Sequence, residues 1–188
     1  MDTPSLPHVK DTFNAFRVES VWLRSVFDTA HALFSSGPDV DSLLRRTAPQ
    51  FFADLNHIII EYWILGVSRL TDPAETFRRE NLTASLLLCQ LDALGISNEG
   101  IRSAAAGLQA YRAILNDARN RAVSHADKNT FLSPALLGDH RESQVTSFLD
   151  HLQSFNDLVG EALGEGPLDF RSTYGPGDAY DLIRALKS

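Results

Sequence analysis

The segment RNRAVSH at residues 119–125 contains two residue types that can act together on a phosphate group. Histidine has an unperturbed pKa of about 6.5, so His125 is suited to accept or donate a proton near neutral pH. The guanidinium of Arg119 is planar and offers donors in a fixed fork, which suits phosphate oxygens on which negative charge develops. The segment is therefore a candidate site for acid–base chemistry beside an anionic group.

Helical geometry limits how these two side chains can cooperate. Arg119 and His125 are six residues apart, so on an ideal helix they lie about 120° apart and about 9 Å apart along the axis. Arg121 and His125, at i and i+4, share a face. A second chain related by a two-fold axis would bring another Arg119 and His125 to the same cleft. We therefore expect a homodimer with a composite site.

A purely structural role for the same residues stays open at this point. Basic side chains in the last turn of a helix interact favourably with its dipole, and a histidine there can bond a free carbonyl. Asp127 can pair with His125 or Arg121. Under this alternative the segment only ends a helix.

Two other groups of residues contain metal-ligand types. Asp54, His57 and Glu61 fall on one helical stripe, for which we expect a hydrogen-bonded polar seam in the core, since no second ligand-rich helix is evident. His57, His125 and His151 lie on three predicted helices and form a three-ligand alternative for a metal-binding bundle hydrolase. Neither group has a His-x-x-x-His pair, so the predicted site contains no metal.

The elements that must position these residues follow from apolar periodicity. Apolar side chains recur every three or four positions in five stretches, and breakers or capping residues separate them. The predicted long helices cover residues 8–34, 49–70, 81–94, 98–125 and 139–163. Asp39 is expected to cap a short helix that ends at Leu44. A last short helix is expected over residues 178–187.

Helices without any alternating strand pattern predict an all-α fold: a single-domain antiparallel helical bundle with four main helices and short additional ones. The bundle is expected over residues 1–163. Residues 164–188 are expected to form a turn-rich connection and a short helix that pack on the same domain.

Composition narrows the functional classes. A formal net charge of −7 argues against a broad nucleic-acid-binding surface but leaves a local basic site possible. The single cysteine, Cys89, precludes an intramolecular disulfide and is expected to pack as a small hydrophobe. Neither a signal peptide nor a membrane span is predicted, so we expect a cytoplasmic protein. Phosphate-binding loops and serine-hydrolase elbows are absent from the sequence.

The position of Arg119 and His125 near the end of a long helix resembles the R-x(4–6)-H signature of the HEPN superfamily. Further strings resemble its abortive-infection (Abi) subgroup: SRLTDP at residues 68–73, ENLT at 80–83 and HAD at 125–127. The resemblance implies a small helical bundle that dimerises. It also implies metal-independent RNA cleavage, without a cofactor, where two copies of the motif meet.

In such a reaction an RNA 2′-hydroxyl attacks the neighbouring phosphorus and the 5′-oxygen leaves. The resemblance then implies catalytic roles for Arg119 and His125 and RNA-binding roles for Asn120, Arg121 and Lys128. It also implies a phage-defence or toxin–antitoxin setting, with an antitoxin or the product of a neighbouring gene as a possible partner. A non-catalytic adaptor or nucleotide-binding dimer remains an alternative.

One position departs from a related pattern. HEPN toxins that a nucleotidyltransferase silences resemble R-x4-H-x-Y, whereas here Asp127 occupies the tyrosine position. Control through modification of that tyrosine is therefore not expected. The default expectation for Arg69 and Asp72, at i and i+3, is a local structural pair at the end of the long helix. The resemblance to the Abi subgroup implies instead that Asp72 caps, and Asn81 holds, the turn beneath the motif.

Overall fold

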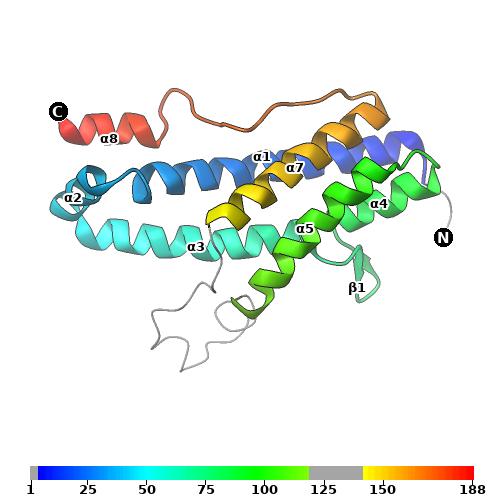
Figure 1. Cartoon of the computed structure of the whole chain (residues 1–188), viewed down its shortest axis with the longest axis horizontal. Coiled ribbons are helices and arrows are strands. Elements are labelled where there is room, and N and C mark those ends of the chain that lie inside the picture. The colour runs from blue at the N-terminus through cyan, green and yellow to red at the C-terminus, as the bar shows by residue number, and fades with distance from the viewer. Residues whose placement is uncertain (1–3, 119–141) are drawn as a thin grey trace.

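The computed structural model describes residues 4–118 and 142–188 (Figure 1). The described helices, in chain order, are α1 (Leu6–Phe34), α2 (Pro38–Thr47), α3 (Pro49–Thr71), α4 (Ala84–Ala93), α5 (Glu99–Ala118), α7 (Glu142–Leu163) and α8 (Ala179–Lys187). Two short strands, β1 (Glu75–Thr76) and β2 (Arg79–Glu80), pair as a hairpin. The predicted all-α class is confirmed. Among the described helices, none has the length and apolar character that a bilayer crossing requires.

Helices α1 and α3 are long antiparallel neighbours, and α2 connects them at one end of the bundle (Figure 1). Leu23 of α1 lies against Gly66, while Phe27, one turn later, contacts Trp63, which precedes Gly66 in α3. A Cβ atom at Gly66 would lie 2.8 Å from Cδ1 of Leu23, so glycine permits this close approach. The two helices thereby form the layer on which the rest of the bundle packs.

Helices α5 and α7 cover this layer and pack closely on each other (Figure 1). The ring centroids of Tyr111 in α5 and Phe148 in α7 are 4.8 Å apart. Phe16 of α1 meets Phe155 of α7 edge to face at 5.5 Å. Burial of these large aromatic side chains supplies much of the stabilisation of the fold.

Some predicted element boundaries were wrong. Gly37, with φ of +101°, occupies the N-cap of α2, so Asp39 is not the cap. The helix predicted from residue 81 begins at Ala84, because the side chain of Thr83 caps it by accepting from the N–H of Leu86 at 3.1 Å. Residues 75–80 form the unpredicted hairpin. Cys89 is exposed rather than packed in the core.

After α7 the chain turns back and runs along the bundle to α8 (Figure 1). Phe170 is buried in the main core. The buried carboxylate of Asp28 accepts from both the N–H and the hydroxyl of Thr173, and it also pairs with Arg24. Helix α8 lies where a last short helix was predicted, and the side chain of Asp178 caps it. Several separate contacts therefore fix this segment on α1.

Candidate functional site

The residues predicted to carry the chemistry lie outside the described part of the chain. These are Arg119, Asn120, Arg121, His125 and Lys128. The described part of α5 ends at Ala118, the residue before Arg119. What the structure describes is therefore the support of the helix that leads to this segment.

An ion pair joins α5 to the end of α3. Nη2 of Arg112 donates to Oδ1 of Asp72 at 2.9 Å, and both side chains are about four-fifths buried, with exposed fractions of 22% and 23%. Asp72 occupies the C-cap position of α3, as predicted, but its described ionic partner is Arg112 rather than Arg69. Arg69 is exposed and forms no ion pair with any described residue. The contact links α3 and α5 rather than acting within one turn.

A second polar contact on the same face of α5 was not predicted. Nε2 of Gln109 donates to the carbonyl oxygen of Thr71 at 2.8 Å and to Oγ of Ser85 at 3.2 Å. Gln109 and Arg112 are one turn apart, so α5 is held at adjacent points to the end of α3 and the start of α4. The signal in the sequence was a stripe of polar residues on one face of this helix, at Gln109, Arg112 and Asn116.

The turn after Asp72 is held by Asn81. Its Nδ2 donates to the carbonyl oxygen of Pro73 and to Oγ1 of Thr76, both at 2.8 Å, and its backbone N–H donates to the carbonyl of Ala74. The prediction that Asn81 holds this turn is confirmed. The strings at residues 68–73 and 80–83 thus form the two sides of one small structure beside α5.

A hollow of about 300 Å³ beside this turn has mixed charge. Arg69 and Asn81 line it together with the carboxylates of Glu19, Asp72 and Glu80. Asp72 is already paired with Arg112, and the two other carboxylates outnumber the guanidinium of Arg69, which disfavours a phosphate there. This hollow is therefore a poor candidate for the RNA site.

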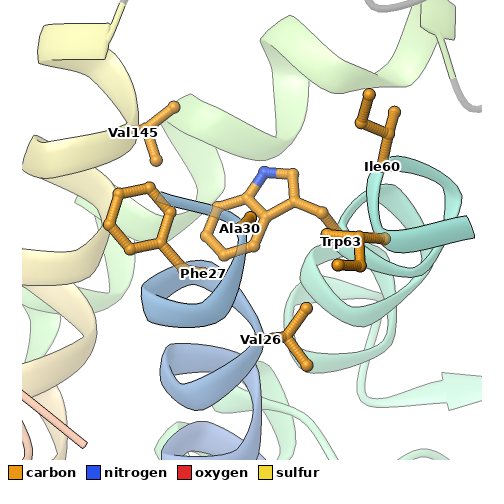
Figure 2. Close-up of a pocket in the computed structure, with 7 residues that line it drawn as sticks. Val26, Phe27, Ala30, Ile60, Trp63 and Val145 are labelled. Atoms are coloured by element: carbon orange, nitrogen blue, oxygen red, sulfur yellow. The ribbon is translucent and has the colours of Figure 1, made fainter. Parts of the chain in front are cut away.

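A pocket of about 130 Å³ lies where α1, α3 and α7 meet, and its lining is apolar (Figure 2). Phe27 and Ala30 come from α1, Ile60 and Trp63 from α3, and Val145 from α7. The only polar group among these side chains, the indole N–H of Trp63, donates to the hydroxyl of Tyr111 at 3.1 Å. The pocket thus contributes no acid, base or nucleophile.

Tyr111 is buried where α5 crosses α3. Burial raises the pKa of its phenol to about 12, because the phenolate would lose its hydration, and the hydrogen bond donated by Trp63 offsets this only in part. The Trp63–Tyr111 contact fixes α5 two turns before the predicted catalytic arginine. It is a structural contact rather than a titrating group near neutral pH.

The described residues do not support the metal-binding alternatives. Within residues 4–118 and 142–188, histidine, cysteine and carboxylate side chains form no group of three that could hold a metal ion. His57 pairs with Glu61 at 3.2 Å, and Asp54 accepts from Gln50. These side chains lie on the surface, so the expectation of a core seam was wrong. Nδ1 of His151 is 2.6 Å from the carbonyl oxygen of Ser147.

Comparison with known proteins identifies the family. The family model HEPN_AbiU2, described as AbiU2, matches residues 6–182. Neither the curated proteins nor the solved structures gave a match. The matched range runs from the first turn of α1 into α8 and includes the segment of Arg119 and His125. Because one family model covers nearly the whole chain, this protein belongs to the HEPN_AbiU2 family, a HEPN-type family associated with Abi systems.

Proposed function

We propose that this protein is a metal-independent endoribonuclease that acts as a homodimer in phage defence or a toxin–antitoxin system. The family match over residues 6–182 carries the proposal, because it includes the R-x5-H segment in the context of a HEPN-type chain. Arg119 and His125 are the proposed catalytic residues. Asn120, Arg121 and Lys128 are the proposed RNA contacts.

The proposed reaction needs only proton transfer and charge stabilisation. A base removes the proton of an RNA 2′-hydroxyl, the 2′-oxygen forms a bond to the adjacent phosphorus, and the bond from phosphorus to the 5′-oxygen breaks. An acid gives the 5′-oxygen a proton, leaving a 2′,3′-cyclic phosphate and a free 5′-hydroxyl. The two His125 side chains of a dimer supply the base and the acid, while Arg119 stabilises the charge on the phosphate oxygens.

The support of α5 is consistent with such a site. Composite active sites lose rate quickly when their groups shift by about an ångström. The contacts made by Gln109, Tyr111 and Arg112 hold α5 to α3 and α4 over the turns that precede Arg119. A helix fixed in this way is a suitable carrier for residues that must meet a second chain.

The deciding experiment measures cleavage of single-stranded RNA by the purified protein in EDTA. We expect cleavage to products with a cyclic phosphate end. His125→Ala should lower the rate on the order of 10²-fold or more, because an acid–base group is lost. Thermal unfolding of this variant should stay close to that of the wild type.

Other outcomes would assign other functions. A strict requirement for bound zinc or iron would reject the proposed mechanism in favour of a metal-binding hydrolase. Binding of a partner protein or nucleotide without cleavage would favour the adaptor alternative. A protein that stays monomeric at micromolar concentration in solution scattering, yet cleaves RNA, would reject the composite site.

A further inference from the structure

The tip of the β1–β2 hairpin exposes an aromatic ring to solvent. Phe77 has an exposed fraction of 95%, the largest among the exposed large apolar side chains of the described residues. No ring of a described residue packs on it, and Phe77 belongs to neither hydrophobic core. The fold gains nothing from an aromatic residue here, because exposed apolar area costs free energy in water.

The backbone at this tip is also unfavourable for the residues it contains. Thr76 pairs with Arg79 across the hairpin, so Phe77 and Arg78 are the two turn residues. Their φ angles are +50° and +62°, in the left-handed region that side chains with a Cβ disfavour. Two-residue turns of this form strongly prefer Asn-Gly. A bulky aromatic residue and an arginine therefore occupy positions where the backbone favours neither.

Two positively charged side chains follow Phe77 in the hairpin. Arg78 and Arg79 are exposed, and neither forms an ion pair with a described residue. Glu75 and Glu80 are strand partners one residue pair further down the hairpin, at its base. The outer end of the hairpin is therefore locally basic in a chain whose net charge is −7.

The base of the hairpin is fixed to the helix that leads to Arg119. Asn81 holds the chain at Pro73 and Thr76, and Asp72, at the start of this turn, pairs with Arg112 of α5. The hairpin and the C-terminal end of α5 project from the same side of the bundle (Figure 1). The exposed tip is thus held in a defined position relative to α5.

We propose that residues 77–79 bind single-stranded RNA. The ring of Phe77 stacks on an unpaired base, and the guanidinium groups of Arg78 and Arg79 bind neighbouring phosphates. Exposed aromatic rings next to basic side chains suit single strands, whose bases are free to stack and whose phosphates need cations. The choice of RNA as the ligand rests on the proposed ribonuclease function, and the hairpin adds a substrate contact outside the catalytic segment.

Binding is tested with a fluorescein-labelled 2′-O-methyl oligouridine, which cannot be cleaved because it lacks the attacking hydroxyl. The double variant Phe77→Asn/Arg78→Gly removes the ring and one phosphate contact, so it should raise the Kd by at least roughly 5-fold, the lower end of the range that base–aromatic stacking alone implies. Its Tm should equal or exceed that of the wild type, because Asn-Gly suits the turn. A lower Tm with an unchanged Kd would give Phe77 a structural role and overturn the proposal.

The phosphate contacts are tested through salt dependence. Arg78→Ala/Arg79→Ala should lower the slope of log K against log salt by about 1.4, since each phosphate contact on a single strand contributes about 0.7. Arg45→Ala/Arg46→Ala on α2, at the opposite end of the bundle (Figure 1), removes the same charge and should leave the slope unchanged. Phe51→Ala, which removes an exposed phenylalanine from α3, is the control for loss of the Phe77 ring and should leave the Kd unchanged. If the two double arginine variants lower the slope equally, the proposal is overturned.

Two further outcomes separate this inference from the proposed function. Hairpin-dependent binding of the methylated oligouridine without cleavage of natural RNA would sustain the hairpin contact and reject the ribonuclease. Cleavage of natural RNA with wild-type binding by the hairpin variants would reject the hairpin contact alone. A third outcome concerns the kind of ligand. If the protein does not bind the oligouridine, but binds vesicles of phosphatidylcholine and phosphatidylglycerol through the hairpin, the proposed RNA contact is overturned in favour of a lipid surface.

Discussion

The guanidinium of Arg112 lies 2.9 Å from the carboxylate of Asp72, and this ion pair connects the helix before the predicted catalytic segment to the end of α3. Because both side chains are largely buried, water screens the pair less than it would on the surface. The pair also joins α5 to the turn that carries the hairpin. With the Gln109 and Tyr111 contacts, it is therefore one of the contacts through which the described residues can influence the position of Arg119.

We predict that this pair stabilises the fold. A double-mutant cycle with Arg112→Ala and Asp72→Ala, followed by urea unfolding, should give a coupling free energy of about 1–2 kcal/mol. Arg102 and Asp92 form a matched pair between α5 and α4 at 2.8 Å, with exposed fractions of 44% and 46%. Its coupling should stay below about 1 kcal/mol because it is more exposed. Equal couplings would show that burial does not distinguish the two pairs.

Replacing Asn81 should loosen the hairpin without unfolding the bundle. Asn81→Asp preserves the shape but cannot donate to Pro73 and Thr76, so we expect faster amide hydrogen exchange over residues 74–80. The free energy of unfolding should fall by about 1–2 kcal/mol. Unchanged exchange over these residues would mean that the strand pairing alone holds the turn.

Tyr111 predicts a loss of stability in alkaline solution. Its pKa is raised to about 12 in the folded state, against about 10 in the unfolded chain, so folding favours the protonated phenol. This contribution is fully present below pH 10 and is lost as the pH rises from 10 to 12, by on the order of 2 kcal/mol.

Tyr111→Phe should remove this part of the pH dependence. At neutral pH the variant should be less stable by about 1–2 kcal/mol, because the indole N–H of Trp63 loses its acceptor. Unfolding measured at pH 9 and pH 11.5 provides the comparison. Parallel stability curves for the variant and the wild type would contradict the assignment to Tyr111.

Gly160 should not tolerate a side chain. In Gly160→Ala the new Cβ would lie 2.3 Å from the carbonyl oxygen of Gly166, and backbone cannot move aside as a side chain can. We expect a loss of about 1–3 kcal/mol, as for other overpacked sites. Gly100→Ala is the control: its nearest atoms are 3.2 and 3.3 Å away and belong to side chains, so its stability should change by less than about 1 kcal/mol.

The role of Arg119 is tested by keeping its charge. Arg119→Lys retains a cation but loses the planar fork, so RNA cleavage should fall on the order of 10²-fold. Arg102→Lys, on the same helix but bound to Asp92, should leave the rate unchanged. If Arg119→Lys cleaves RNA at the wild-type rate, Arg119 contributes only its charge, and the proposed stabilisation through its geometry is wrong.

Several features were determined by the sequence alone. Apolar spacing located α1, α3, α5 and α7, because burying one helical face requires apolar side chains every three or four residues. The turn-rich stretch up to Gly177 located the start of the last helix near Asp178, which is the N-cap of α8. The strings around residues 68–73, 80–83 and 119–127 indicated the family that the match over residues 6–182 then identified.

Other features were decided only by tertiary structure. The sequence suggested a local contact between Arg69 and Asp72, but the crossing of α5 over the end of α3 gave Asp72 a partner 40 residues away. The hairpin was missed because its strands are two residues long and its turn lacks the usual Asn-Gly signal. The Gln109 contacts were missed for the same physical reason as the ion pair. Spacing along one chain predicts which side chains share a face, whereas the partner of that face is determined by how separate helices pack.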